Sequence, residues 1–160
     1  MTSRSTSLTT NGPEKTAEIA VRIGATLRSG DVLLLSGGIG AGKSHFARRL
    51  IQSLQDVPED VPSPTFTLVQ EYETQKGMLW HADLYRLSDP DEVAELGLLD
   101  AMQDAICLIE WPNRLEDMTP ENALSVNFET HAPPRSEHER TLTFTWSNIR
   151  WDTVCAELRA

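Results

Sequence analysis

The residues with the clearest capacity for chemistry lie in one glycine-rich stretch. Gly37, Gly42, Lys43 and Ser44 match G-x-x-x-x-G-K-[ST], the pattern of a phosphate-binding loop. Glycines let successive backbone N–H groups turn towards phosphate oxygens. The lysine of this pattern reaches the terminal phosphates, and the final hydroxyl binds Mg²⁺. The pattern therefore predicts a nucleotide site rather than an ordinary turn before a helix.

The segments on either side of this stretch are those that its mechanism needs. Residues 32–35 form a continuous apolar run, which is typical of a strand buried on both faces. After Ser44, apolar residues recur at helical spacing as far as Leu54. A strand, a loop and a helix are thus expected in the required order. Nucleotide binding alone leaves the function open, because kinases, switches and motors share this loop.

Two carboxylates and one hydroxyl are candidates for work on a bound nucleotide. Glu110 follows the apolar run 105–109, where a second acid often holds Mg²⁺ directly or through water. The simpler interpretation of Glu110 is an exposed carboxylate at a strand end. Asp83 ends the stretch 78–83 and is a candidate to orient water or metal. Thr65 follows a proline-rich loop, so it could sense a terminal phosphate as switch residues do.

Three ring-bearing residues leave alternatives open. Trp111 directly follows Glu110, where an indole can stack on a nucleotide base or pack in the core. His45 and His81 are single histidines, for which packing or support of a neighbouring group is a simpler interpretation than metal binding.

Composition narrows the setting. The formal net charge of −10 opposes direct binding to nucleic acid, which needs many Lys or Arg side chains at phosphates. No apolar run is long enough to span a bilayer, and the N-terminus lacks the apolar core of a signal peptide. Cys107 and Cys155 have no metal-like spacing, so we expect buried free thiols. These features favour a cytoplasmic protein that does not bind membranes.

The remaining elements follow from periodicity and from breaker residues. We expect a mobile polar tail over residues 1–12 and a single domain over residues 13–160. Helices are predicted over residues 13–27, from Pro90 and over 151–158, and strands over 65–72, 78–83, 105–109, 124–128 and 142–146. The predicted fold class is α/β: a P-loop NTPase-like three-layer sandwich with a mixed central sheet and an antiparallel C-terminal hairpin.

Together these residues closely resemble one family: TsaE, also called YjeE, the small bacterial ATPase of tRNA threonylcarbamoyladenosine synthesis. The likeness includes the strings SPTFTLV (63–69), HADLYRL (81–87) and IEWP (109–112), and Thr16 in the first helix. Order and spacing match from about Pro13 to Pro112. The first two strings are far more specific than the phosphate loop.

The resemblance implies roles for the matching residues. ATP would be bound by Gly38, Gly40, Ala41, Gly42, Lys43, Ser44, His45, Trp111 and Arg140. Mg²⁺ would be held by Ser44 and Glu110, and hydrolysis would depend on Asp83, Thr65 and Glu110. Trp111 would lie against the base.

The chain departs from the family pattern at a few positions. The family usually has Asp at the position of Gly38 and Thr at that of Ser44, which keeps the hydroxyl. For the family's late hairpin arginine, Arg140 and Arg135 are both candidates.

The implied function is ATP binding and slow hydrolysis in support of threonylcarbamoyladenosine modification next to the tRNA anticodon. The chain would act with the TsaD and TsaB subunits without transferring the group itself, and would meet tRNA only through that complex. A small-molecule kinase is the alternative, although the arginine-rich lid insertion usual in such enzymes is not found. A GTP switch would need an [NT]-K-x-D string, which the sequence lacks. A nucleotide-binding scaffold without activity is a further alternative.

Overall fold

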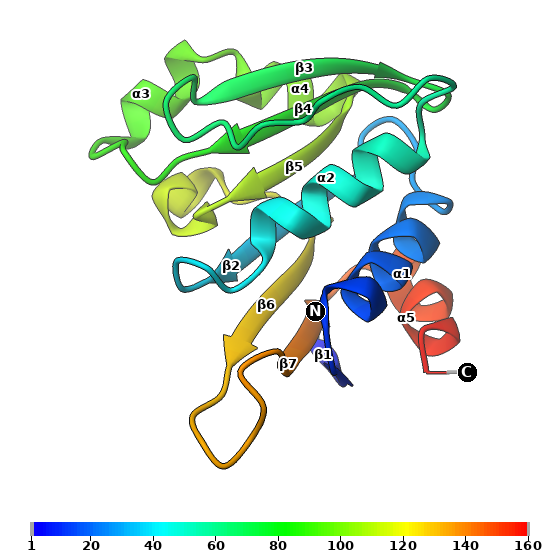
Figure 1. The fold of residues 1–160 in the computed structure, drawn as a ribbon. Helices are drawn as coiled ribbons and strands as arrows, with labels where there is room; N and C mark the ends of the chain where they lie inside the picture. Colours follow the sequence, from blue (N-terminus) through cyan, green and yellow to red (C-terminus); the bar gives the residue numbers. More distant parts are fainter. Residues whose placement is uncertain (1, 160) are drawn as a thin grey trace.

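A mixed seven-stranded sheet is the centre of the fold (Figure 1). The structure is a computed structural model that describes residues 2–159. The strands are β1 (Arg4–Thr10), β2 (Val32–Gly37), β3 (Val69–Thr74), β4 (Gly77–Asp83), β5 (Ile106–Glu110), β6 (Leu124–Thr130) and β7 (Arg140–Trp146). Their order across the sheet is β1-β7-β6-β2-β5-β4-β3. Strands β6, β2, β5 and β4 are parallel, and antiparallel pairs complete both edges.

Helices cover both faces of this sheet. They are α1 (Pro13–Gly24), α2 (Lys43–Ser53), α3 (Pro90–Glu95), α4 (Leu98–Asp104) and α5 (Asp152–Glu157), with 3₁₀ helices η1 (Pro112–Met118) and η2 (Ile149–Trp151). Side chains of β2 alternate between two apolar clusters. Leu33 and Leu35 join the cluster under α1, α2 and α5, whereas Val32 and Leu34 join the cluster under α3, α4 and η1. The predicted α/β class, the mixed sheet and the antiparallel β6–β7 hairpin are therefore confirmed.

The prediction of a mobile tail over residues 1–12 is wrong. Arg4–Thr10 form β1, which pairs with β7 along its whole length. Only Leu8 packs against the apolar cluster, and Thr10 is fully buried. An edge strand keeps much of its surface in water, so its sequence can be polar, and threonine favours extended backbone. The Ser/Thr composition that suggested mobility is thus compatible with an edge strand.

The first strand of the β3–β4 pair begins later than predicted. We expected a strand over residues 65–72, but residues 64–67 form a turn and β3 starts at Val69. The backbone N–H of Leu68 donates to the carbonyl of Pro64 at 2.7 Å, and Leu68 has a φ of 70°. The segment before β3 is therefore folded back towards the end of β4, where the N–H of Asp83 donates to the Leu68 carbonyl.

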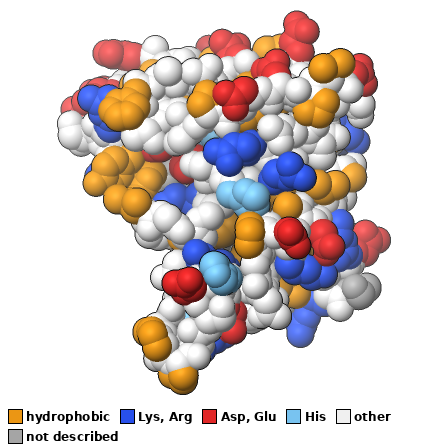
Figure 2. Space-filling view, viewed as in Figure 1, with side chains coloured by type: hydrophobic (Ala, Val, Ile, Leu, Met, Phe, Trp, Pro, Cys, Tyr) orange, Lys and Arg blue, Asp and Glu red, His pale blue; other side chains and the backbone are white. Residues whose placement is uncertain are grey.

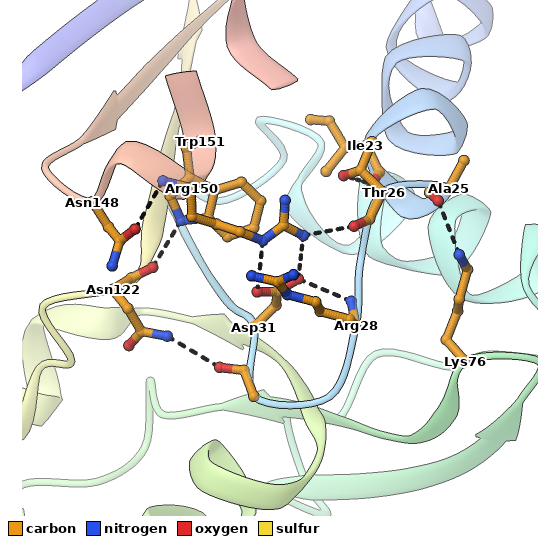
Figure 3. Close-up of polar contacts among 11 residues, drawn as sticks. Ile23, Ala25, Thr26, Arg28, Asp31, Lys76, Asn122, Asn148, Arg150 and Trp151 are labelled. Atoms are coloured by element: carbon orange, nitrogen blue, oxygen red, sulfur yellow. Dashed lines mark hydrogen bonds and ion pairs between the residues drawn. The ribbon is translucent and has the colours of Figure 1, made fainter. Parts of the chain in front are cut away.

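The C-terminal segment is fastened to the turn before β2 (Figure 3). Arg150 Nη2 donates to Asp31 Oδ2 at 2.7 Å and to the Thr26 carbonyl at 2.6 Å. The backbone N–H of Arg28 donates to the same oxygen of Asp31 at 2.9 Å. Asp31 is buried at the start of the central strand. This network therefore anchors the last helices at the end of the sheet opposite the glycine-rich stretch.

Two further expectations concern thiols and membranes. Cys107 and Cys155 are free and buried, as predicted, and burial raises the pKa of each thiol to about 12. Among residues 2–159, no helix combines the length and the apolar character that crossing a bilayer requires.

Candidate active site

The candidate site lies where the parallel strands end. Gly37, Asp83 and Glu110 are the last residues of the neighbouring strands β2, β4 and β5. Ligands of open α/β sheets bind at this carboxyl edge. A cleft of about 470 Å³ opens there. It brings together eleven of the twelve predicted site residues: Gly38, Gly40, Ala41, Gly42, Lys43, Ser44, His45, Thr65, Asp83, Glu110 and Trp111.

The glycine-rich loop, residues 37–42, joins β2 to α2. At Gly37, with a φ of 140°, an added Cβ would lie 2.5 Å from the carbonyl oxygen of Phe128, so only glycine fits. Helix α2 then starts at Lys43 without a side-chain cap. The first backbone N–H groups of a helix have no carbonyl partner within it and carry the positive end of its dipole. The loop therefore presents a positive backbone surface to the cleft.

Lys43 adds a buried cation to this surface. Its Nζ donates to the carbonyls of Gly37 and Gly38, at 2.5 and 3.2 Å. Burial lowers the pKa of Lys43, and the nearby charges of Glu110 and Asp83 partly offset that effect. The ammonium group is thus held by neutral carbonyls in a partly desolvated position, which suits an incoming anion.

Glu110 is enclosed by two donors. Its side chain is buried, with only 2 % of the residue exposed, so the interpretation as an exposed strand-end carboxylate is wrong. The Ser44 hydroxyl lies 3.1 Å from both carboxylate oxygens, and His81 Nε2 lies 2.7 Å from Oε2. A hydroxyl and a carboxylate side by side are oxygen ligands of the kind that Mg²⁺ accepts.

Asp83 and Thr65 form a second polar pair. The Thr65 hydroxyl donates to Asp83 Oδ2 at 3.0 Å, and the backbone N–H of Tyr85 donates to Oδ1 at 3.0 Å. The Ser63 and Thr65 hydroxyls are 2.8 Å apart. The segment before β3 is therefore attached to the end of β4 through the Asp83 carboxylate.

Trp111 lies between the core and the cleft. It packs partly against the cluster under α3, α4 and η1, and it also lines the cleft. One face of its ring meets Lys43 Nζ, 4.1 Å from the ring centre. The Tyr85 ring lies 4.8 Å away, centre to centre. Both interpretations of this residue, packing and facing a ligand, therefore retain a structural basis.

Of the two candidate arginines, Arg140 reaches the loop. Arg140 Nε donates to the Ala41 carbonyl at 3.1 Å and Nη2 to that of Gly40 at 3.4 Å. It lines a smaller cavity of about 200 Å³, beside Thr16 and His45. Arg135 instead pairs with Glu139 within the β6–β7 connection. Arg140 is thus the predicted residue outside the main cleft, although it touches the loop that lines it.

Sequence reasoning missed four residues of the cleft wall: Ile39, Arg48, Ser63 and Tyr85. Ser63 and Tyr85 lie within the strings SPTFTLV and HADLYRL, which single them out only through the resemblance. Arg48 stands one helical turn after Ser44 and therefore shares its face of α2. Within residues 2–159, no group of three or more His, Cys, Asp or Glu side chains is arranged to hold a metal ion.

The fold and site together define an α/β protein with a mixed seven-stranded sheet and a cleft at the ends of its parallel strands. The family model "Threonylcarbamoyl adenosine biosynthesis protein TsaE" matches residues 10–141. The chain therefore belongs to the TsaE family, whose members are proteins of tRNA threonylcarbamoyladenosine biosynthesis. The resemblance expected from Pro13 to Pro112 is confirmed and extends into the β6–β7 hairpin.

Individual relatives agree with this placement. The chain is 35% identical over 150 residues to the TsaE protein of Bacillus subtilis, covering 93% of this chain and 90% of the relative. It is 37% identical over 119 residues to the TsaE protein of Rickettsia bellii, covering 74% of this chain and 83% of the relative. Among solved structures, it is similar to Bacillus subtilis YdiB, with a TM-score of 0.76, 30% identity, and coverage of 99% and 97%.

Proposed function

We propose that the protein binds ATP with Mg²⁺ in this cleft and hydrolyses it slowly, in support of tRNA threonylcarbamoyladenosine biosynthesis. One observation carries the proposal: the uncapped start of α2, the Lys43 amine and the Ser44–Glu110 pair all meet in one cleft. They would form an anion site and a metal site side by side, which is what a magnesium nucleotide requires.

The chain's own groups divide the work. The N–H groups at the start of α2 and the Lys43 ammonium would hold the phosphates. Ser44 and Glu110 would hold Mg²⁺, which when bound neutralises phosphate charge and orients the terminal group. Asp83 would hold Thr65 near that group and accept a hydrogen bond from the attacking water.

The surface around the cleft is of a kind that a partner protein could cover. Ile39 and Tyr85 line it and Phe66 follows Thr65, yet these three apolar residues are 82, 44 and 81% exposed. Figure 2 shows hydrophobic side chains gathered where β5 ends. Exposed apolar groups around the cleft favour a protein partner that covers it. We propose TsaD and TsaB as these partners, with covering of the nucleotide accelerating its hydrolysis.

Direct binding of tRNA is not part of this proposal. The formal net charge is −10, and acidic and basic side chains are interspersed on the face seen in Figure 2. Affinity for nucleic acid comes mainly from many cationic contacts to phosphates.

Phosphate release with and without TsaD and TsaB tests the proposal, with the Lys43→Ala variant as the inactive control. We expect slow release by the chain alone and faster release with the partners, since a completed site can gain about 10³-fold or more. Retention of tRNA by the isolated chain is measured at physiological salt in parallel. Full activity without partners, or tight tRNA binding, would contradict the partner role. Transfer of phosphate to a metabolite in place of water would favour the small-molecule kinase.

A further inference from the structure

His81 is a buried polar residue that the proposed function does not yet use. It lies in β4, two residues before Asp83, and only 1% of it is exposed. Its Nε2 lies 2.7 Å from Glu110 Oε2 on the neighbouring strand β5. This is the one hydrogen bond that its ring makes among residues 2–159.

Beside an ionised Glu110, the contact requires the proton of the ring to be on Nε2. A carboxylate only accepts hydrogen bonds, so Nε2–H of His81 donates to Glu110. The other nitrogen, Nδ1, is buried and has no hydrogen-bond partner among residues 2–159. Burying an unpaired polar atom opposes folding. Burial of this imidazole therefore lowers the stability of the fold, and the one polar contact of its ring among residues 2–159 is with Glu110.

The two donors around Glu110 act differently on its carboxylate. The Ser44 hydroxyl is 3.1 Å from Oε1 and 3.1 Å from Oε2, so it does not favour one orientation. His81 contacts Oε2 alone. The imidazole thereby leaves Oε1 with the Ser44 hydroxyl as its one side-chain donor among residues 2–159, and so open to a further ligand.

We propose that His81 is a positioning residue for the magnesium site: it holds Glu110 Oε2 so that Oε1, beside Ser44, faces the metal ion. This proposal rests on the proposed function. Hydrogen bonds that orient a ligating side chain are worth about 10- to 100-fold in metal affinity. Without the imidazole, the carboxylate can rotate and Oε2 loses a buried donor.

Two substitutions separate positioning from packing. His81→Leu removes the hydrogen-bond donor and fills its space with an apolar side chain. His81→Gln keeps an N–H donor at a similar distance from the backbone. Lys76→Ala changes a side chain in another part of the fold and is the control. ATP binding is measured by titration calorimetry in EDTA and at increasing Mg²⁺. In His81→Leu we expect the Mg²⁺ concentration that gives half of the maximal increase in ATP affinity to rise about 10- to 100-fold. Affinity in EDTA should match the wild type, and His81→Gln should recover most of the Mg²⁺ response.

A second measurement needs no nucleotide, and it does not depend on whether His81→Leu folds. Proton–nitrogen correlation spectra of the wild-type imidazole rings report which nitrogen bears the proton, and loss of one signal set in His81→Gln assigns His81. We expect the proton on Nε2. A proton on Nδ1 alone would remove the donor from Glu110 and overturn the proposal.

The outcomes also distinguish this proposal from the one on which it rests. If the wild type binds ATP with the same affinity with and without Mg²⁺, the magnesium site itself fails, and the role of His81 fails with it. If the wild type needs Mg²⁺ and folded His81→Leu needs no more, only the role of His81 is refuted.

Discussion

The ammonium group of Lys43 lies over the ring of Trp111, 4.1 Å from its centre. If Lys43 holds the terminal phosphates as proposed, Trp111 would stand at the phosphate end of the bound nucleotide. A cation over an indole affects the electrons from which its emission arises. The position of Lys43 should therefore be visible in the fluorescence of Trp111.

The first prediction follows from this contact. We expect ATP with Mg²⁺ to change Trp111 emission because Lys43 leaves the ring for the phosphates. Tripolyphosphate, which has no base, should reproduce most of the change. The emission change is measured in the wild type and in Trp111→Phe. Subtracting the second from the first cancels the contribution of Trp80, Trp146 and Trp151, which both proteins contain. A response to ATP but none to tripolyphosphate would instead support stacking of the base on Trp111.

Lys43→Ala should weaken ATP binding. The substitution removes a hydrogen bond between charged groups, worth about 1.5–3 kcal/mol, which corresponds to roughly 10- to 100-fold in affinity. Titration calorimetry measures the change. Lys76→Ala is the control, because Lys76 donates to the Ala25 carbonyl in another part of the fold. Wild-type affinity in Lys43→Ala would show that the nucleotide lies elsewhere.

Thr65 and Asp83 should act as one unit in hydrolysis. Their side chains share a hydrogen bond of 3.0 Å, so Thr65→Ala and Asp83→Asn each disturb the same contact. We expect both variants to bind ATP, and phosphate release to fall by about 10²-fold or more. The double variant should lose less than the product of the single losses. Strictly independent effects would mean that the contact plays no part in turnover.

Two adjacent glycines should differ sharply in what they tolerate. Gly37→Ala places a Cβ against the Phe128 carbonyl at a φ of 140°, whereas nothing lies within 4 Å of a Cβ at Gly38. Urea unfolding should show Gly37→Ala destabilised by about 1–3 kcal/mol. Gly38→Asp should stay within about 0.5 kcal/mol of the wild type. A destabilised Gly38→Asp would mean that the loop itself excludes the aspartate usual in the family.

Arg150→Ala tests the anchor at the opposite end of the sheet. Removing the guanidinium leaves the buried Asp31 without its ion pair, which we expect to cost on the order of 3 kcal/mol of unfolding free energy. Lys15→Ala breaks the exposed pair with Glu18 and should cost less than about 1 kcal/mol. ATP affinity should be unchanged in both variants. Equal stability losses would contradict a structural role for the buried pair.

The central strands were predictable because burial on both faces leaves a continuous apolar run, as in residues 32–35 and 105–109. The edges were harder. Strand β1 carries hydroxyl side chains that give no apolar alternation, and the late start of β3 depends on a turn at Leu68. Helix α4 was not predicted separately from the helix at Pro90. In the structure Gly97, with a φ of 80°, divides the two helices.

In the site too, features formed by residues close in sequence were predictable, and contacts between residues far apart in sequence were not. Residues of the glycine-rich loop are consecutive in the chain, so their spacing identified them. The contacts of Thr65 with Asp83 and of His81 with Glu110 join residues 18 and 29 positions apart. Such contacts depend on strand register, which one sequence does not specify in detail. For this reason Thr65, Asp83 and Glu110 were predicted as individual candidates, whereas the Thr65–Asp83 and His81–Glu110 contacts were not.

The register of β1 against β7 has a practical consequence for how the protein can be handled. Arg4 stands opposite Trp146, whereas Thr10 stands opposite Arg140, which touches the glycine-rich loop. Because a strand rises about 3.3 Å per residue, β1 carries the chain roughly 20 Å away from that loop. Arg4 there meets Asp152, at the start of α5. A dye attached to an exposed side chain beside Arg4 and Asp152 is thus remote from the cleft, and the labelled protein should bind nucleotide as the unlabelled protein does.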